Sequence, residues 1–283
     1  MNARPAPLAR EAAAHGAWQA RLTLEFAPVG ARTALVRRRH TGPLLVQRPF
    51  HPEGAPCHVY LVHPPGGIVG GDDLALELTC LAGSHAVLTT PAATRFYRAG
   101  PHPEARLRQI LHVHDAALEW LPQETILFDG ARARTATEVR LDAGARFLGW
   151  ELTCLGRPSN RESLHEGVLA ADFRLYRDGR PVLFDRLRLR GASPALHAHW
   201  GLAGQQALGT LVATPAADVD LAPLRAIRMP DVRFALTRVE DVLVCRALSL
   251  QAEPLRALFT RLWLALRPAL FQREAVPPRI WAT

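Results

Sequence analysis

Lysine is absent from this chain of 283 residues, so all 34 basic side chains are arginines. The chain therefore has no Walker-type lysine for a nucleotide phosphate, no Schiff-base amine and no serine–lysine dyad. Its formal net charge is still +8, which favours an acidic partner, either a nucleic acid or an acidic protein surface. The arginines are scattered, with one run at Arg37–Arg39 and few aromatics between them, so nucleic-acid recognition by stacking has little support.

Cysteine is scarce and widely spaced. The four cysteines form no C-x-x-C pair, which argues against a zinc ribbon or a redox dithiol; they are Cys57, Cys80, Cys154 and Cys245. The N-terminus has no continuous apolar core of signal-peptide length, and no later run reaches membrane-spanning length without an arginine. We therefore expect a soluble, reduced, cytoplasmic protein without a membrane partner.

Period-two alternation of apolar and polar residues dominates the first two thirds of the chain. In Arg21–Phe26, for example, the apolar side chains fall on one face of an extended strand and the polar ones on the other. Gly, Pro or Asp-Gly turns, such as Asp178-Gly179, punctuate these runs. The pattern predicts a mainly β, many-stranded fold, with strands within residues 21–26, 58–62, 74–80, 86–90, 106–113, 126–128, 146–152, 173–176 and 186–190.

Helical spacing appears only late in the sequence. Residues 218–228 fit one short helix, and residues 252–270 carry apolar side chains at i, i+3, i+4 and i+7 intervals that predict a second. Pro254 fits the first turn of this second helix, and Pro268 fits its end. No composition shift or polar linker divides the chain, so we expect one domain.

A glycine-rich loop, HPPGGIVGGDD at residues 63–73, follows an apolar run. Such a loop after a strand is typical of phosphate-binding sites. It has neither the GxxxxGK[ST] nor the GxGxxG spacing, and Asp72 and Asp73 would repel a phosphate. From the residues alone, a tight turn between two strands is the remaining interpretation.

Histidine pairs are the main candidates for a metal site. His112 and His114 would share one strand face with Asp115 beside them, and His197–His199 repeats the spacing. Neither pair has a third ligand at a fixed local offset, so partly exposed strand histidines are the better interpretation. No serine lies in a GxSxG elbow, and Cys154 has no diagnostic flanking motif. The residues alone indicate a basic, β-rich protein outside the common enzyme classes.

Six segments stand in a characteristic order along the chain: HVYLVHPPGGIVGGDDL, LTTPAATRFYRA, LEWLPQETILFDGA, GWELTCLGRP, RDGRPVLFDRLRL, and a terminal LRPAL followed by PPRIWAT. They run from about Trp18 to Thr283. Each is weakly specific alone, whereas HPPGGIVGGD, LEWLPQE and PRIW in this order are highly specific. Together they resemble the urease accessory protein UreD (UreH) family.

The resemblance implies a scaffold rather than an enzyme. Members of this family bind UreF, which recruits the GTPase UreG, and the assembly docks on apo-urease and assists nickel insertion. The family fold is a right-handed β-helix-like stack of many short strands with two helices in the C-terminal region. We therefore expect transient nickel(II), no permanent cofactor and no nucleic acid. Residues 1–16 match no family segment and are expected to form a flexible tail before a single UreD-like domain at 17–283.

The resemblance also implies a water-filled nickel passage through the scaffold. Its motifs assign the lining to Asp72, Thr94, Glu151 and Asp185. Separated carboxylates suit a transferred ion, whereas a closed histidine or cysteine cage would trap it. Alternatively, the carboxylates pair with arginines and only hold the fold, the candidates being Arg95, Arg157 and Arg186.

The C-terminal segment is the candidate docking site for the partner protein. Ile280 and Trp281 lie in its PPRIW run, and packing of these side chains in the protein core is an equally good interpretation. Two other functions stay open at this point. One is a basic, β-rich nucleic-acid-binding module, and the other is a metalloenzyme built on the histidine pairs.

Overall fold

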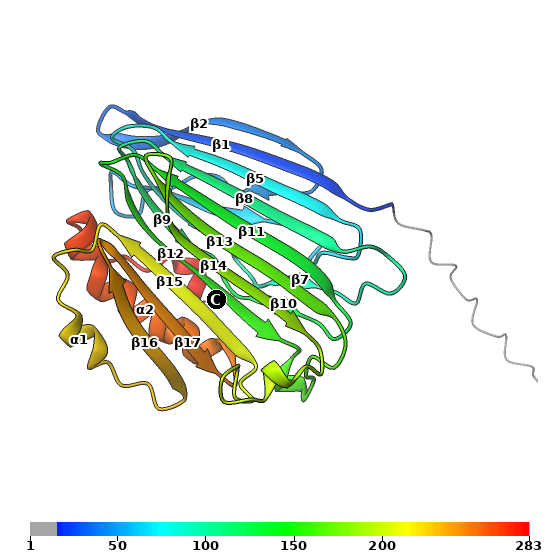
Figure 1. Ribbon diagram of the computed structural model, residues 1–283. Coiled ribbons are helices and arrows are strands. Elements are labelled where there is room, and N and C mark those ends of the chain that lie inside the picture. Colours follow the sequence, from blue (N-terminus) through cyan, green and yellow to red (C-terminus); the bar gives the residue numbers. More distant parts are fainter. Residues whose placement is uncertain (1–15, 283) are drawn as a thin grey trace, which may run out of the picture.

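The computed structural model describes residues 16–282 and shows two β-sheets stacked face to face (Figure 1). The expected N-terminal tail therefore lies, apart from Gly16, outside the described residues. One sheet has seven strands in the order β14-β13-β11-β8-β5-β1-β2. These are β1 (Gln19–Val29), β2 (Arg32–Thr41), β5 (Asp73–Cys80), β8 (Ala105–Val113), β11 (Arg132–Leu141), β13 (Val168–Arg177) and β14 (Arg180–Arg190).

The second sheet has ten strands, eight of them in the order β16-β17-β15-β12-β9-β6-β4-β3, with β10 paired to β12 and β7 paired to β10. The strands are β3 (Leu45–Val46), β4 (Cys57–Val62), β6 (His85–Thr89), β7 (Thr94–Phe96), β9 (Ala117–Leu121), β10 (Thr125–Leu127), β12 (Arg146–Leu155), β15 (Ala207–Thr214), β16 (Val232–Val239) and β17 (Val242–Ser249).

The chain passes repeatedly from one sheet to the other between β4 and β13. Strands β1, β5, β8, β11 and β13 are parallel in one sheet, and β4, β6, β9 and β12 are parallel in the other. The stacked coils form a β-solenoid of about four turns, which confirms the expected β-helix-like stack. The turn that joins β13 to β14 has positive φ at Asp178 (50°) and Gly179 (74°), the geometry of a tight hairpin turn that the Asp-Gly pair predicted.

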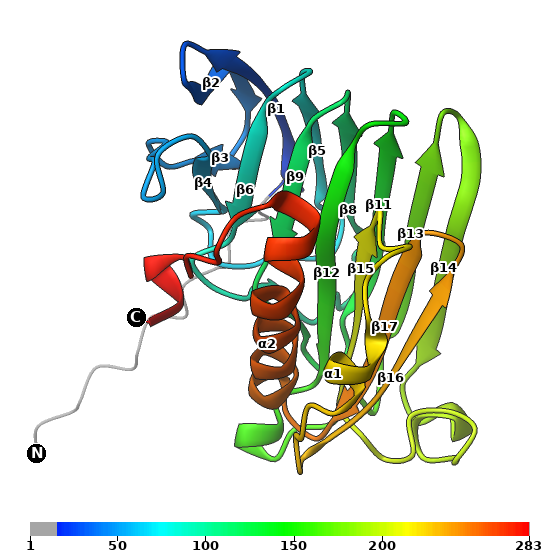
Figure 2. The same cartoon turned by 90° about the vertical axis from the view of Figure 1, so that its left-hand side faces the viewer.

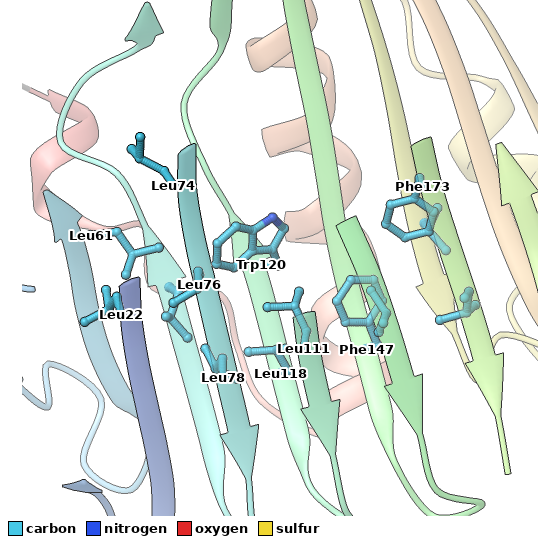
Figure 3. Close-up of a cluster of buried hydrophobic side chains, with 14 of the residues drawn as sticks. Leu22, Leu61, Leu74, Leu76, Leu78, Leu111, Leu118, Trp120, Phe147 and Phe173 are labelled. Atoms are coloured by element: carbon cyan, nitrogen blue, oxygen red, sulfur yellow. The ribbon is translucent and has the colours of Figure 1, made fainter. Parts of the chain in front are cut away.

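Alternating side chains fill the space between the sheets. From β1, Leu22, Leu24 and Phe26 are buried, while the intervening polar residues point outward. They meet inward-facing side chains from the other sheet, such as Trp120 and Phe147 (Figure 3). Each large apolar side chain buried in this way contributes about 1.5–3 kcal/mol of transfer free energy, so the inter-sheet layer is the main stabilising element.

Helix α2 (Ala252–Phe271) packs on the outer face of the ten-stranded sheet (Figure 2) and confirms the helix predicted at 252–270. Pro254 lies in its first turn as expected. Pro268 does not end the helix, which continues to Phe271, because burial of Leu270 and Phe271 against the sheet offsets the backbone hydrogen bond that proline cannot make. The short helix is α1 (Leu221–Arg225), and three 3₁₀ turns are η1 (Pro158–Asn160), η2 (Pro194–Leu196) and η3 (Arg279–Ala282).

Several regions differ from the sequence-based expectation, among them β2, β3, β7 and β11, which lie where no strand was predicted. Strands β15, β16 and β17 fall in a part of the chain where no strand was predicted. Strand β15 is covered by the inter-sheet core on one face and by α2 on the other, so its sequence does not alternate. His197–His199 lies in a turn after η2 rather than on a strand. No helix within residues 16–282 is long and apolar enough to cross a membrane.

Candidate functional site

Two cavities adjoin at strand β12, between the sheets. The inner one has a volume of about 330 Å³ and the outer one about 520 Å³. Glu151 and Thr153 line both, and we call this pair of residues the neck. The alternation of β12 turns these two side chains toward the inter-sheet space, while Trp150 and Leu152 face α2. The neck is therefore the part of the lining that the two cavities have in common.

The inner cavity exists because polar residues interrupt the apolar inter-sheet core. Gln109 on β8 and Thr135 and Thr137 on β11 occupy inward-facing positions that neighbouring rungs fill with leucine, alanine or valine. The Thr137 hydroxyl lies 2.5 Å from Glu151 Oε1 and 3.0 Å from Gln109 Oε1. The Thr137 hydroxyl is the donor in both contacts, and its single proton is shared between the Glu151 and Gln109 oxygens.

Glu151 is a titratable group placed between two layers of β-sheet. Burial raises the pKa of its carboxyl to about 7, the Thr137 hydrogen bond opposes the rise, and the negative charge of Asp185 adds to it. A carboxyl that titrates near neutral pH can exchange a proton for a cation without a large energetic change.

Asp185 lies on β14 and lines the outer cavity. Its Oδ2 accepts a hydrogen bond from the Thr210 hydroxyl at 3.3 Å and pairs with Arg246 at 3.3 Å. The arginine side chain is 54% exposed, so it can move into solvent without losing buried contacts. Neither Arg157, which pairs with Glu162, nor Arg186, which is on the outer face of the sheet, is the partner of Asp185.

Thr94 and His63 line the inner cavity near the glycine-rich loop. Burial lowers the pKa of the His63 imidazole, and the negative charge of Asp72 offsets only part of this effect, so the ring is neutral at pH 7. His63 Nε2 and the Trp120 indole N–H are buried polar atoms without a hydrogen-bond partner in the described residues, and both side chains line this cavity. The cavity is large enough to hold several water molecules, which these unpaired polar atoms could bind.

Asp72 is the predicted lining residue that lies elsewhere. Its Oδ1 accepts the Trp18 backbone N–H at 2.7 Å and its Oδ2 accepts the Val69 N–H at 2.9 Å, and the side chain is 1% exposed. It thus fixes the end of the loop between β4 and β5. Gly67 is required there because a Cβ would meet the Tyr97 ring at 2.1 Å. Among the residues that line the two cavities, three of the four predicted positions are present: Thr94, Glu151 and Asp185.

Trp281 packs into an aromatic group at the C-terminal end of the chain. Its indole donates to the Thr89 hydroxyl at 3.0 Å, and its ring lies 5.9 Å from Trp150 and 5.7 Å from Trp263. Ile280 beside it is half-buried. These contacts give Trp281 a structural role, and its part in partner docking stays a prediction.

The histidine pairs do not converge with other ligands. The rings of His112 and His114 stack 6.2 Å apart, with His114 next to Asp142 at 3.0 Å. Over residues 16–282, no group of three or more His, Cys, Asp or Glu side chains is placed to hold a metal ion. A tightly bound resident metal therefore has no candidate site in this part of the chain.

The sequence did not single out several residues that the structure brings to the cavities: Gln109, Thr135, Thr137, Thr153, Thr210 and Arg246. A usable signal was present for some of them. In β8 and β11, glutamine and threonine occupy the inward-facing positions of an alternating strand, where a core would require apolar side chains. Arg246 carried no such signal, because its contact with Asp185 depends on the fold.

Comparison with known proteins identifies the class. A family model described as "UreD urease accessory protein" matches residues 19–282. The urease accessory protein UreD of Alkalilimnicola ehrlichii is 44% identical over all of this chain and 97% of its own length. The proteins of that name from Pseudomonas putida strain W619 and Hahella chejuensis are 45% and 40% identical, each over 94% of this chain and over 95% and 91% of their own lengths.

The chain belongs to the UreD family of urease accessory proteins. Its role is in urease maturation.

Proposed function

We propose that the chain is a non-catalytic scaffold that binds UreF and, through it, UreG, docks on apo-urease, and conducts nickel(II) toward the urease active site through its two cavities. The observation that carries the proposal is the neck, where Glu151 and Thr153 line both cavities. Nickel is the cargo here, and the chain keeps no metal of its own.

The donor set suits an ion in transit. Thr94, His63 and Gln109 in the inner cavity, then Glu151, then Asp185 in the outer cavity, offer oxygen and neutral imidazole contacts in sequence. Nickel(II) accepts both donor types, and separated single ligands release it more readily than a closed cage. The Glu151 carboxyl gives up its proton when the ion arrives and recovers it when the ion leaves, so the empty neck avoids a buried unpaired charge.

The test replaces Glu151 or Asp185 by leucine in cells that express the complete urease gene cluster. We expect urease activity and the nickel content of purified urease to fall, while the complex with UreF, UreG and apo-urease still forms. Glu253→Leu is the matched control, because that carboxylate is exposed in the first turn of α2, lines neither cavity and should not affect activation. Normal activation by both cavity variants would exclude the passage, and loss of the complex would favour a purely structural role.

A further inference from the structure

The outer face of the seven-stranded sheet carries a concentration of positive charge. Helix α2 covers the ten-stranded sheet, whereas no helix of the described residues covers this face (Figure 2). On β8, β11 and β14 the side chains of seven arginines are exposed, and we call them the arginine patch: Arg106, Arg108, Arg132, Arg134, Arg186, Arg188 and Arg190.

The strand register places these arginines close to one another. Arg106 is directly opposite Arg134, while Arg132 and Arg190 stand on either side of Val168. Side chains directly opposite on neighbouring strands are about 5 Å apart at Cβ, and like charges at that distance destabilise a sheet. The patch therefore carries a cost to folding that the rest of the chain must offset.

Carboxylates within the face compensate only part of this charge. Glu104 accepts from Arg134 at 2.8 Å and lies 3.7 Å from Arg106, and Asp172 pairs with Arg188 at 2.7 Å. The other four patch arginines have no ion-pair partner within residues 16–282; they are Arg108, Arg132, Arg186 and Arg190. With Arg140, Arg174 and Glu138 included, nine arginines on the outer face of β8, β11, β13 and β14 thus face three carboxylates, and the surplus charge is directed into solvent.

We propose that the arginine patch is a docking surface for a carboxylate-rich face of apo-urease. The inference rests on the urease-maturation role, which supplies a protein as the partner. Guanidinium groups pair with carboxylates through two parallel hydrogen bonds, which suits a flat acidic protein surface. With strands about 4.8 Å apart and a rise of about 3.3 Å per residue, the whole sheet face measures roughly 30 Å by 30 Å, comparable to one side of a standard protein interface.

A nucleic acid fits this surface less well. Glu104 and Asp172 stand within or beside the patch and would repel a phosphate backbone. The nearest aromatic side chains, Tyr176 and Phe184, lie edge to face with each other at 5.6 Å rather than side by side as a platform for bases. A flat sheet face also does not enter a groove as a helix or a β-ribbon does.

The experiment reverses three unpaired patch arginines together, Arg132→Glu, Arg186→Glu and Arg190→Glu, in the full chain co-expressed with UreF. The matched control reverses three exposed arginines that lie outside the patch and also lack an ion-pair partner in the described residues, Arg32→Glu, Arg48→Glu and Arg228→Glu, with the same change in net charge. Binding to immobilised apo-urease is measured by biolayer interferometry at about 50 mM and about 200 mM NaCl.

We expect the wild-type complex to bind apo-urease with an affinity that falls as salt rises. At low salt, the patch variant should bind at least ten-fold more weakly than the wild type, and the control variant within two-fold of it. Equal affinities for the two triple variants would overturn the docking surface while leaving the maturation role intact. Absence of wild-type binding would overturn the proposed docking on apo-urease altogether. Patch-dependent binding of a short RNA duplex, tested in parallel, together with unchanged urease binding would replace the protein partner by a nucleic acid.

Discussion

Replacing Glu151 by glutamine should stabilise the protein in a pH-dependent way. Burial raises the pKa of the carboxyl from its usual value of 4.5 to about 7 in the folded chain. Below pH 4.5 the Glu151 carboxyl is neutral in both the folded and the unfolded chain, so its ionisation does not change the free energy of unfolding. Between the two values the unfolded chain releases a proton that the folded chain retains, so stability falls as pH rises. Above the pKa of the folded chain, the loss of unfolding free energy is complete and amounts to about 3 kcal/mol.

Glutamine keeps the shape and the contact with Thr137 but never ionises. The gain in unfolding free energy over the wild type should therefore grow from about 1 kcal/mol at pH 5 to about 3 kcal/mol at pH 8. Urea unfolding followed by tryptophan fluorescence across this range measures the gain, and Glu77→Gln on the outer face serves as the control. A gain that does not change with pH would refute the placement of an ionisable group in a desolvated neck.

Three further predictions concern the rest of the fold. Arg267→Met should lower the unfolding free energy by about 3–5 kcal/mol, because Arg267 is fully buried and neutralises Glu53 at 2.6 Å and Glu119 at 3.0 Å. Thermal unfolding measures this loss, and a change of less than about 1 kcal/mol would contradict the buried ion pair. Deleting Ile280 to Thr283 should lower the melting temperature through loss of the Trp281 contacts, whereas weaker pull-down of UreF with unchanged melting would assign the segment to docking instead. The four cysteine thiols should resist a thiol reagent at pH 8 until denaturant is added, because burial raises the pKa of each, to about 11 for Cys57 and about 12 for Cys154; rapid labelling of the folded protein would contradict this.

Coverage explains only part of what was predictable, because β12, buried on both faces, was predicted, whereas β2 and β11, each with one face in solvent, were not. Strands with one face on the core and one in solvent, such as β1 and β5, alternate strictly and were predicted from the sequence. Strand β15 lies between the inter-sheet core and α2, so its residues ALGTLVAT are apolar on both faces and carry no period-two signal. Helix α2 was predictable because only one of its faces is buried.

The candidate site was less predictable, because it is made by strands distant in the chain. Glu151 and Asp185 were assigned from motif resemblance, whereas their hydrogen-bond and ion-pair partners, Thr137 and Arg246, are set by register between the sheets. Asp72 came from the most conspicuous motif, yet both of its oxygens are used by backbone N–H groups of the loop. Sequence motifs alone do not separate a residue that holds a turn from one that lines a cavity.

The most direct test of the passage narrows the neck without changing any charge. Thr153→Phe would fill the space that both cavities share, and Thr153→Val, which has nearly the same volume, is the control. With each variant assembled with UreF, UreG and apo-urease, the nickel bound per urease active site is measured by mass spectrometry after activation. The account predicts normal nickel loading with the valine variant and strongly reduced loading with the phenylalanine variant in an intact complex. Equal loading with both variants would contradict a nickel passage through the neck.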